Sequence, residues 1–177
     1  LRSYLLDLID RYERRPEDNL ISVLLQHEDD DVLTREELVS TCTLLLFGGH
    51  ETTTNLIGNG MLALLTHPEQ RAELVEHPDL INQAVEEILR YDGPARATVR
   101  LAKHDHVIGG HQVKAGQRVF LINPAGNRDP DVYRDPDTLD IRRNPTNHLG
   151  LGAGIHYCVG APLARLEGTL AIAALTT

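Results

Sequence analysis

The chain has 177 residues, of which 41% are apolar and 24% charged, a composition typical of a globular chain that can bury a core. Acidic residues outnumber basic ones, 26 against 17, and the formal net charge of −9 disfavours a general binding surface for nucleic acid or anionic lipid. With no long apolar run and no basic-then-apolar leader, we expect no membrane span, no signal peptide and a cytoplasmic location. Two cysteines cannot form a disulfide framework.

Both ends of the chain lie inside helical patterns. Leu1 falls within one pattern, Thr177 falls within another, and the single methionine is Met61. We therefore expect this sequence to be a piece of a longer protein, with material missing before Leu1 and after Thr177.

The first third of the chain predicts helices. Apolar residues recur with helical spacing on either side of the polar segment 11–19, which predicts two helices before residue 26. The acidic run Glu28–Asp31 is typical of a solvated connection. Thr34 and Glu37 match a capping box, and no proline follows until Pro68, so we predict one helix of about 30 residues with a weak centre at the pair Gly48-Gly49.

The rest of the chain predicts a change from helix to strand and back. Pro68 and Pro78 each stand where a short helix can begin. Short strands are then expected at Thr98–Ala102, His106–Ile108, Gln112–Val113 and Arg118–Ile122. Segment 123–156 has little periodicity, and loops of that length usually carry function. With a last helix just after Cys158, the predicted fold is mainly α with a small antiparallel β-sheet.

The strongest motif is the segment Gly152–Gly160, which reads GAGIHYCVG. Its five fixed positions would match somewhere in this chain by chance with a probability of about 10⁻⁵. Its glycines permit tight turns and a close approach to a flat ligand. A cysteine just before a helix has its thiolate stabilised by free N–H groups and the helix dipole, so Cys158 is predicted to ligate a metal. Cys42, without such a frame, is expected to be a small apolar residue.

This segment resembles the haem-thiolate loop of the cytochromes P-450, Phe-Gly-x-Gly-x-His-x-Cys-x-Gly, with Cys158 at the position of the axial ligand. The stretch Gly49–Thr52 is similar to the central-helix motif of that family, and Glu87–Arg90 to its Glu-x-x-Arg motif. Segments Asn127–Pro130 and Asp135–Arg143 resemble the family's stretch before the haem loop. The matches cover essentially the whole chain in the family's order, and they are most similar to the soluble bacterial branch.

The resemblance implies that residues 1–177 are part of a single haem-binding domain whose cofactor is haem b, iron protoporphyrin IX. A thiolate at Cys158 would donate electron density to the iron, which favours cleavage of the O–O bond. His156 and Arg100 match positions whose side chains bind the haem propionates, and an Arg–carboxylate pair suits that role. The glycines expected at the cofactor are Gly49, Gly152, Gly154 and Gly160.

Two further sets of residues acquire roles from the resemblance. Glu51 and Thr52 match an acid–alcohol pair that passes protons to bound dioxygen at a locally opened helix, where Gly48 and Gly49 would make room. Glu87 and Arg90 match a buried structural network completed by an arginine from the long loop. Arg143 is the better match for that arginine, and Arg142 is its rival.

The implied activity is that of a monooxygenase, which uses O2 to insert one oxygen atom into a small apolar organic substrate. Electrons would come from NAD(P)H through ferredoxin reductase and ferredoxin. We expect an acidic ferredoxin to dock near Arg142, Arg143 and Arg165, and we expect no nucleic-acid or membrane partner. The 177-residue piece alone is expected to bind haem poorly and to be inactive.

Two positions depart from the family's pattern. Leu151 stands where the family usually has phenylalanine beside the haem sulfur; it should keep the apolar cover but change the solvation of the thiolate. Gly48 stands where the central motif more often has alanine, which weakens the centre of the long helix further. Neither change removes a reacting group.

Other classes of protein fit the sequence less well. A zinc site would draw on His148, His156 and Cys158, but no compact fourth ligand is present. A non-catalytic haem-binding protein would keep Cys158 and His156 without needing the pair Glu51-Thr52. A dinucleotide-binding motif at Gly152 and Gly154 would need a third glycine where Tyr157 stands, and the similar pattern at Gly58 and Gly60 lies inside a predicted helix instead of after a strand. No serine has the Gly-x-Ser-x-Gly frame of a hydrolase.

Overall fold

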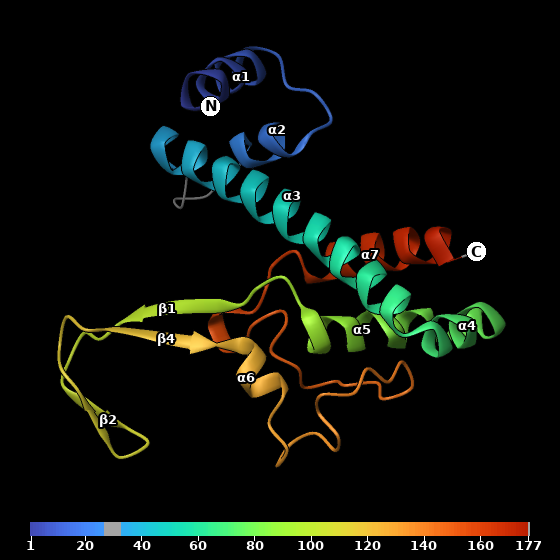
Figure 1. Ribbon diagram of the computed structural model, residues 1–177. Helices are drawn as coiled ribbons and strands as arrows, with labels where there is room; N and C mark the ends of the chain where they lie inside the picture. The colour runs from blue at the N-terminus through green and yellow to red at the C-terminus, as the bar shows by residue number, and fades with distance from the viewer. Residues whose placement is uncertain (27–32, 177) are drawn as a thin grey trace. The chain divides into compact units, whose positions relative to one another are not determined.

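The computed structural model describes residues 1–26 and 33–176 (Figure 1). The predicted acidic connection Glu28–Asp31 lies outside these residues. The chain divides into two compact units, Leu1–Glu51 and Thr52–Thr177. Across the described ranges, none of the helices combines the length and the apolar character needed to cross a membrane.

The first unit contains α1 (Arg2–Arg14), α2 (Leu20–Leu25) and the beginning of α3 (Arg35–Thr66), which confirms the two helices predicted before residue 26. The Asn19 side chain caps α2 by accepting a hydrogen bond from the Ser22 backbone N–H at 2.9 Å. The unit's core is made of four buried apolar side chains, Leu5, Ile9, Leu38 and Val39. Cys42 packs against this core, and burial raises the pKa of its thiol.

The predicted capping box at the start of α3 is confirmed. The Thr34 backbone N–H donates to a Glu37 carboxylate oxygen at 2.8 Å, and the Glu37 backbone N–H donates to the Thr34 hydroxyl at 3.2 Å. The Thr34 hydroxyl also donates to the same carboxylate oxygen at 2.7 Å, and this hydrogen bond, together with the one from the Thr34 backbone, holds the pKa of the Glu37 carboxyl below its usual value. The helix is 32 residues long, close to the predicted length, and it continues through Gly48 and Gly49.

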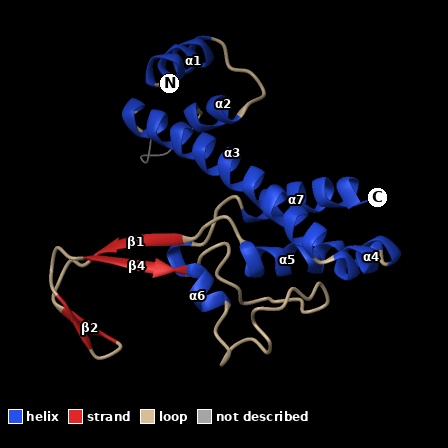
Figure 2. Ribbon diagram, in the orientation of Figure 1, coloured by secondary structure: helices blue, strands red, loops and turns tan. Residues whose placement is uncertain are grey.

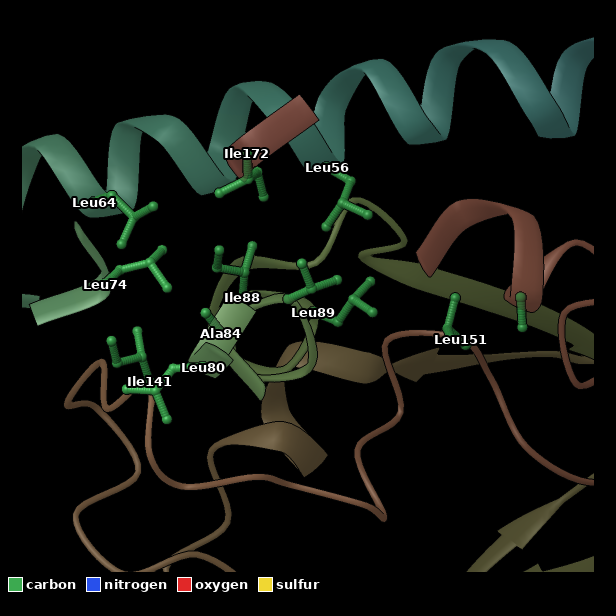
Figure 3. Close-up of a cluster of buried hydrophobic side chains, with 12 residues drawn as sticks. Leu56, Leu64, Leu74, Leu80, Ala84, Ile88, Leu89, Ile141, Leu151 and Ile172 are labelled. Carbon is green, nitrogen blue, oxygen red and sulfur yellow. The ribbon is translucent and has the colours of Figure 1, made fainter. Parts of the chain in front are cut away.

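The second unit is built on a helical core, shown in Figure 3. Besides the C-terminal part of α3, this core draws on α4 (Pro68–Glu76), the one-turn 3₁₀ helix η1 (Pro78–Leu80), α5 (Ile81–Asp92) and α7 (Ala161–Thr176). Proline stands in the first turn of both α4 and η1, as predicted. Buried side chains from these helices form one cluster with Ile141 and Leu151 of the long loop.

Two glycines let α3, α5 and α7 approach each other closely. A Cβ on Gly60 of α3 would lie 3.0 Å from the Ile172 side chain and 3.2 Å from that of Ile88. A Cβ on Gly168 of α7 would lie 3.3 Å from Leu56 and 3.4 Å from Val85. Because these distances are at or below ordinary carbon contact, the two glycines allow the helices to pack at this spacing.

The strands form two separate sheets (Figure 2) where the sequence had predicted a single one. β1 (Ala97–Leu101) pairs antiparallel with β4 (Arg118–Ile122), and the hairpin β2 (His106–Ile108) to β3 (His111–Val113) lies between them in sequence. The hairpin turns at Gly109 and Gly110, both at positive φ, which glycine tolerates best. β2 and β3 are joined by this two-residue turn and pair with each other, while β1 and β4 pair separately.

The long segment after β4 contains one helix that periodicity did not predict, α6 (Asn123–Asn127), with proline in its first turn. It contains a single 3₁₀ turn near its end, η2 (Gly154–His156). Arg90 of α5 holds the long segment in place by donating hydrogen bonds to the backbone carbonyls of Asn127, Pro136 and Thr138. The conformation of this segment therefore depends on hydrogen bonds from a buried side chain of α5 instead of on strand pairing within the segment.

Candidate functional site

Cys158 lies at the end of a tight loop, three residues before Ala161 begins α7. Gly152 and Gly154 both have positive φ, +74° and +65°, which confirms the expected sharp turns. Gly160 is not at positive φ, and a Cβ there would lie at an ordinary distance of 3.9 Å from the Cys158 sulfur. The Cys158 carbonyl accepts a hydrogen bond from the backbone N–H of Ala161, the first residue of α7, at 3.2 Å.

Leu151, the residue that replaces the expected phenylalanine, ties the loop to the core of the second unit. It is buried, its carbonyl accepts the Cys158 backbone N–H at 2.9 Å, and its side chain belongs to the main cluster in Figure 3. Cys158 is itself partly buried against the same cluster. Leu151 and Cys158 therefore share one apolar cluster, and Leu151 also holds the cysteine through a backbone hydrogen bond.

The surface beside the cysteine is unusually apolar. Ile155 is 98% exposed and Val159 is 86% exposed, although each is close to Cys158 in the loop. Large aliphatic side chains left this open cost free energy in water unless a ligand or more protein covers them. A flat, mostly apolar group ligated by the cysteine, such as haem, fits this surface.

The two predicted propionate ligands are also accessible. His156 is exposed, and Arg100 on β1 is partly buried and donates to the neighbouring Val99 carbonyl at 3.0 Å. Neither side chain forms an ion pair with any residue in the ranges 1–26 and 33–176. Both are therefore available to the carboxylates of a cofactor, which supports the fit of this residue set to haem.

The predicted proton-transfer residues Glu51 and Thr52 are exposed on α3. The structure differs from the expectation of a locally opened helix, because α3 is continuously helical through this stretch. No proline interrupts the helix here, so the helical conformation continues in spite of the low helix propensity of the two glycines. A Cβ on Gly48 or Gly49 would have no neighbour within 4 Å, so there is open space beside both.

The predicted network of Glu87, Arg90 and Arg143 is present. The carboxylate of Glu87 accepts two hydrogen bonds from Arg90, at 2.7 and 2.8 Å, and one from Arg143 at 3.1 Å. The side chains of Glu87 and Arg90 are fully buried. Arg143 is thus the third member, as predicted, while its rival Arg142 pairs with Glu73.

A second network next to the cysteine was not predicted. The Glu86 carboxylate contacts His148 Nε2 at 2.9 Å and accepts from the Arg165 guanidinium at 3.0 Å, and Arg165 also donates to the Tyr157 hydroxyl at 2.9 Å. Burial opposes ionisation of Glu86, but the hydrogen bonds from His148 and Arg165 outweigh it and lower the carboxyl pKa to about 2. Glu86 directly precedes the Glu-x-x-Arg motif, yet nothing in the sequence marks its partners 62 and 79 residues away.

The zinc site that the sequence left as a less fitting alternative is not assembled by these residues. His148, which would be one ligand, is buried and engaged by Glu86. Over the described part of the chain, no three side chains of histidine, cysteine, aspartate or glutamate gather as a metal site would require.

The three arginines expected to dock a ferredoxin all have carboxylate partners already. Arg142 pairs with Glu73, Arg143 with Glu87 and Arg165 with Glu86. An acidic partner would have to compete with these carboxylates, so the charge available for docking is smaller than the sequence predicted.

An open pocket of about 390 Å³ lies away from the predicted chemistry. It is lined by polar and charged residues of the long loop and α4, together with one leucine: Gln70, Arg134, Asp135, Thr138, Leu139, Asp140 and Arg143. Neither Cys158 nor Thr52 contributes to it, and its mixed charges do not match an apolar substrate.

Comparison with known proteins identifies the family to which this chain belongs. A family model described as cytochrome P-450 matches residues 7–176. The chain is 49% identical over 170 residues to the biotin biosynthesis cytochrome P-450 of Bacillus subtilis, covering 96% of this chain and 43% of the relative. It is 51% identical over 178 residues to the vitamin D(3) 25-hydroxylase of Pseudonocardia autotrophica, covering 99% and 44%.

Solved structures agree with the sequence relatives. A cytochrome P-450 crystallised with an acyl carrier protein ligated to hexadec-9Z-enoic acid superposes with a TM-score of 0.94 at 48% identity, covering 98% of this chain and 45% of that one. The described fold is therefore a partial cytochrome P-450 fold, mainly helical with small antiparallel sheets. The chain spans less than half the length of the relatives it matches.

Proposed function

Because the chain belongs to the cytochrome P-450 family, we propose that it provides the cysteine-ligand part of a haem-thiolate monooxygenase. The observation that carries this proposal is the position of Cys158, held before α7 by a tight glycine turn and bordered by uncovered apolar side chains. Relatives named as hydroxylases support the reaction class.

Cys158 would bind the haem iron as a thiolate, because the free N–H groups and the dipole at the start of α7 favour the negative charge. His156 and Arg100 would hold the propionates by hydrogen bonds and charge. Haem b bound in this way would supply the oxygen chemistry, in which one atom of O2 enters the substrate and the other leaves as water. The membership of residues 1–177 in one haem-binding domain is part of the same proposal.

Proton delivery is assigned to the Glu51 carboxylate and the Thr52 hydroxyl, both of which water can reach. Consecutive residues on a helix point about 100° apart, so they do not face each other. A bridging water would therefore carry the proton between the two side chains. A non-catalytic haem-binding protein, the alternative function, would have no need of this pair.

The remaining partners follow from the reaction. Two reducing equivalents are needed for each turnover, and we assign them to NAD(P)H acting through ferredoxin reductase and ferredoxin in the cytoplasm. The substrate is proposed to be a small apolar organic molecule. Relatives with similar identity bear the names of different reactions, so the substrate is not carried over from any one of them.

The test is a carbon monoxide difference spectrum of the dithionite-reduced full-length protein, measured with Cys158→Ala beside it. A thiolate-ligated haem gives a strongly red-shifted Soret band, and we expect Cys158→Ala to abolish that band. Cys42→Ala is the matched control, because Cys42 packs in the first unit and is expected to leave the band unchanged. A band that survives the loss of Cys158, or a protein that binds no haem, would reject the proposal.

Substrate turnover with a ferredoxin system separates the enzyme from the non-catalytic alternative. Thr52→Ala is expected to keep the red-shifted band while more of the consumed O2 is released as peroxide without product. Full coupling in Thr52→Ala would contradict the role assigned to Thr52.

A further inference from the structure

The network around Glu86 connects both ends of the loop that carries Cys158. At the start of the loop, His148 Nε2 contacts Glu86 at 2.9 Å, and His148 Nδ1 accepts the Gly150 backbone N–H at 3.0 Å. Accepting at Nδ1 leaves Nε2 to donate to the carboxylate. The histidine is therefore fixed between α5 and the loop, with its side chain only 3% exposed.

At the other end, Arg165 of α7 joins the same carboxylate to the residue before the cysteine. Its guanidinium donates to Glu86 and, through its other terminal nitrogen, to the Tyr157 hydroxyl at 2.9 Å. The planar fork of arginine permits both contacts at once, which a lysine would not reproduce. One carboxylate on α5 thereby restrains the chain on both sides of the glycine turn.

The loop also contacts α5 through its backbone. A Cβ on Gly150 would lie 2.5 Å from the Leu89 carbonyl oxygen, so the loop rests directly on the end of α5. The next residue, Leu151, accepts the Cys158 backbone N–H. A change at Glu86 can therefore reach the cysteine through His148, Gly150 and Leu151, and independently through Arg165 and Tyr157.

We propose that Glu86 is the positioning residue of the cysteine ligand: through His148 and through Arg165 with Tyr157, it keeps the Cys158 sulfur in one place for the haem iron. This inference rests on the proposed function, since it concerns the same ligand. It extends that function, because Glu86 lies on another helix and belongs to neither the cysteine motif nor the Glu87 network. The partial burial of Glu86, with its side chain 19% exposed, makes its pairs stronger than ordinary surface ion pairs.

The test uses the full-length, haem-loaded protein with Glu86→Gln and Tyr157→Phe. The carbon monoxide complex is followed over time in mild urea as its red-shifted band converts to the shorter-wavelength band of a protein without thiolate ligation. We expect Glu86→Gln to accelerate this conversion by about tenfold, the effect of losing one charge-assisted hydrogen bond. Tyr157→Phe, which removes one of the two connections, should give a smaller acceleration.

The matched control is Glu73→Gln. Glu73 pairs with Arg142 in a similar partly exposed ion pair, and within residues 1–26 and 33–176 neither side chain has a hydrogen bond or ion pair to the cysteine loop. Thermal unfolding of each variant separates global destabilisation from ligand positioning. If the two variants lose the same amount of thermal stability, the red-shifted band should still convert faster in Glu86→Gln than in Glu73→Gln.

The outcomes distinguish the two proposals. A wild-type protein with no red-shifted band would reject the monooxygenase function and this inference with it. A normal wild-type band, together with Glu86→Gln and Tyr157→Phe variants that convert no faster than Glu73→Gln, would overturn the positioning role alone. Tyr157→Phe keeps the test decisive if Glu86→Gln does not fold, because Tyr157 is 48% exposed and phenylalanine preserves its ring.

Discussion

At the scale of single residues, the buried pair of Glu87 and Arg90 is costly to break. Both side chains are completely buried, and Arg90 also satisfies three backbone carbonyls of the long loop. Removing one partner would leave an uncompensated buried charge. We predict that Arg90→Ala lowers the free energy of unfolding of the full-length protein by about 3–5 kcal/mol, measured by urea denaturation.

An exposed pair at the end of the same helix, between Asp92, its last residue, and Arg96 just beyond it, provides the comparison. Arg96 contacts Asp92 at 2.7 Å, but the Arg96 side chain is 65% exposed. Such pairs contribute roughly 0–1 kcal/mol, so Arg96→Ala should have little effect on the unfolding curve. Equal losses in Arg90→Ala and Arg96→Ala would show that the buried network does not hold the loop together.

The residues that could be predicted differ physically from those that could not. Cys158 stands in a glycine frame that the sequence shows directly, whereas the buried network of Glu87, Arg90 and Arg143 was expected only from the family resemblance. Glu86 and His148 meet only after the long loop has packed on α5, so no local spacing marks them. For the same reason the sequence does not mark Gly150. Only glycine fits there, because a Cβ would collide with the Leu89 carbonyl of α5.

At the scale of elements, helices with local start signals were predicted well. Capping at Thr34 and prolines at the starts of α4 and η1 act within one turn, so the sequence alone marks where these helices begin. The pairing of strands depends on contacts between elements, and there the prediction of one sheet was wrong. Short α6 was missed because five residues are too few to show a period.

Within α3, two nearby glycines should respond to the same substitution in opposite ways. A Cβ on Gly58 meets nothing within 4 Å, so Gly58→Ala should stabilise the protein by about 0.5–1 kcal/mol through helix propensity alone. A Cβ on Gly60 would press against Ile172 and Ile88, so Gly60→Ala should destabilise it by about 1–3 kcal/mol. Thermal or urea unfolding of the two variants measures the difference, and stabilisation by both would show that the three helices are not closely packed at Gly60.

At the scale of the whole molecule, α7 and the cysteine loop leave several large apolar side chains exposed. On α7, Leu163, Leu166 and Leu170 recur three and four residues apart, which places them on one face, and each is more than half exposed. Ile155 and Val159 add to the uncovered surface beside the cysteine. Because the chain spans less than half of its relatives' length, we expect the rest of the protein to cover the leucine row.

This expectation gives a prediction that compares two lengths of the protein. In the isolated 177-residue chain, Leu166→Lys should reduce self-association and the binding of a hydrophobic dye, because it interrupts an exposed apolar row. In the full-length protein the same change should lower the free energy of unfolding by at least about 2 kcal/mol, because it places an amine in a buried site. Val107→Lys on the β2–β3 hairpin is the control, expected to change stability by no more than about 0.5 kcal/mol. If the full-length protein tolerates Leu166→Lys as well as Val107→Lys, the leucine row is open to solvent there too, and some other surface must pack against the rest of the chain.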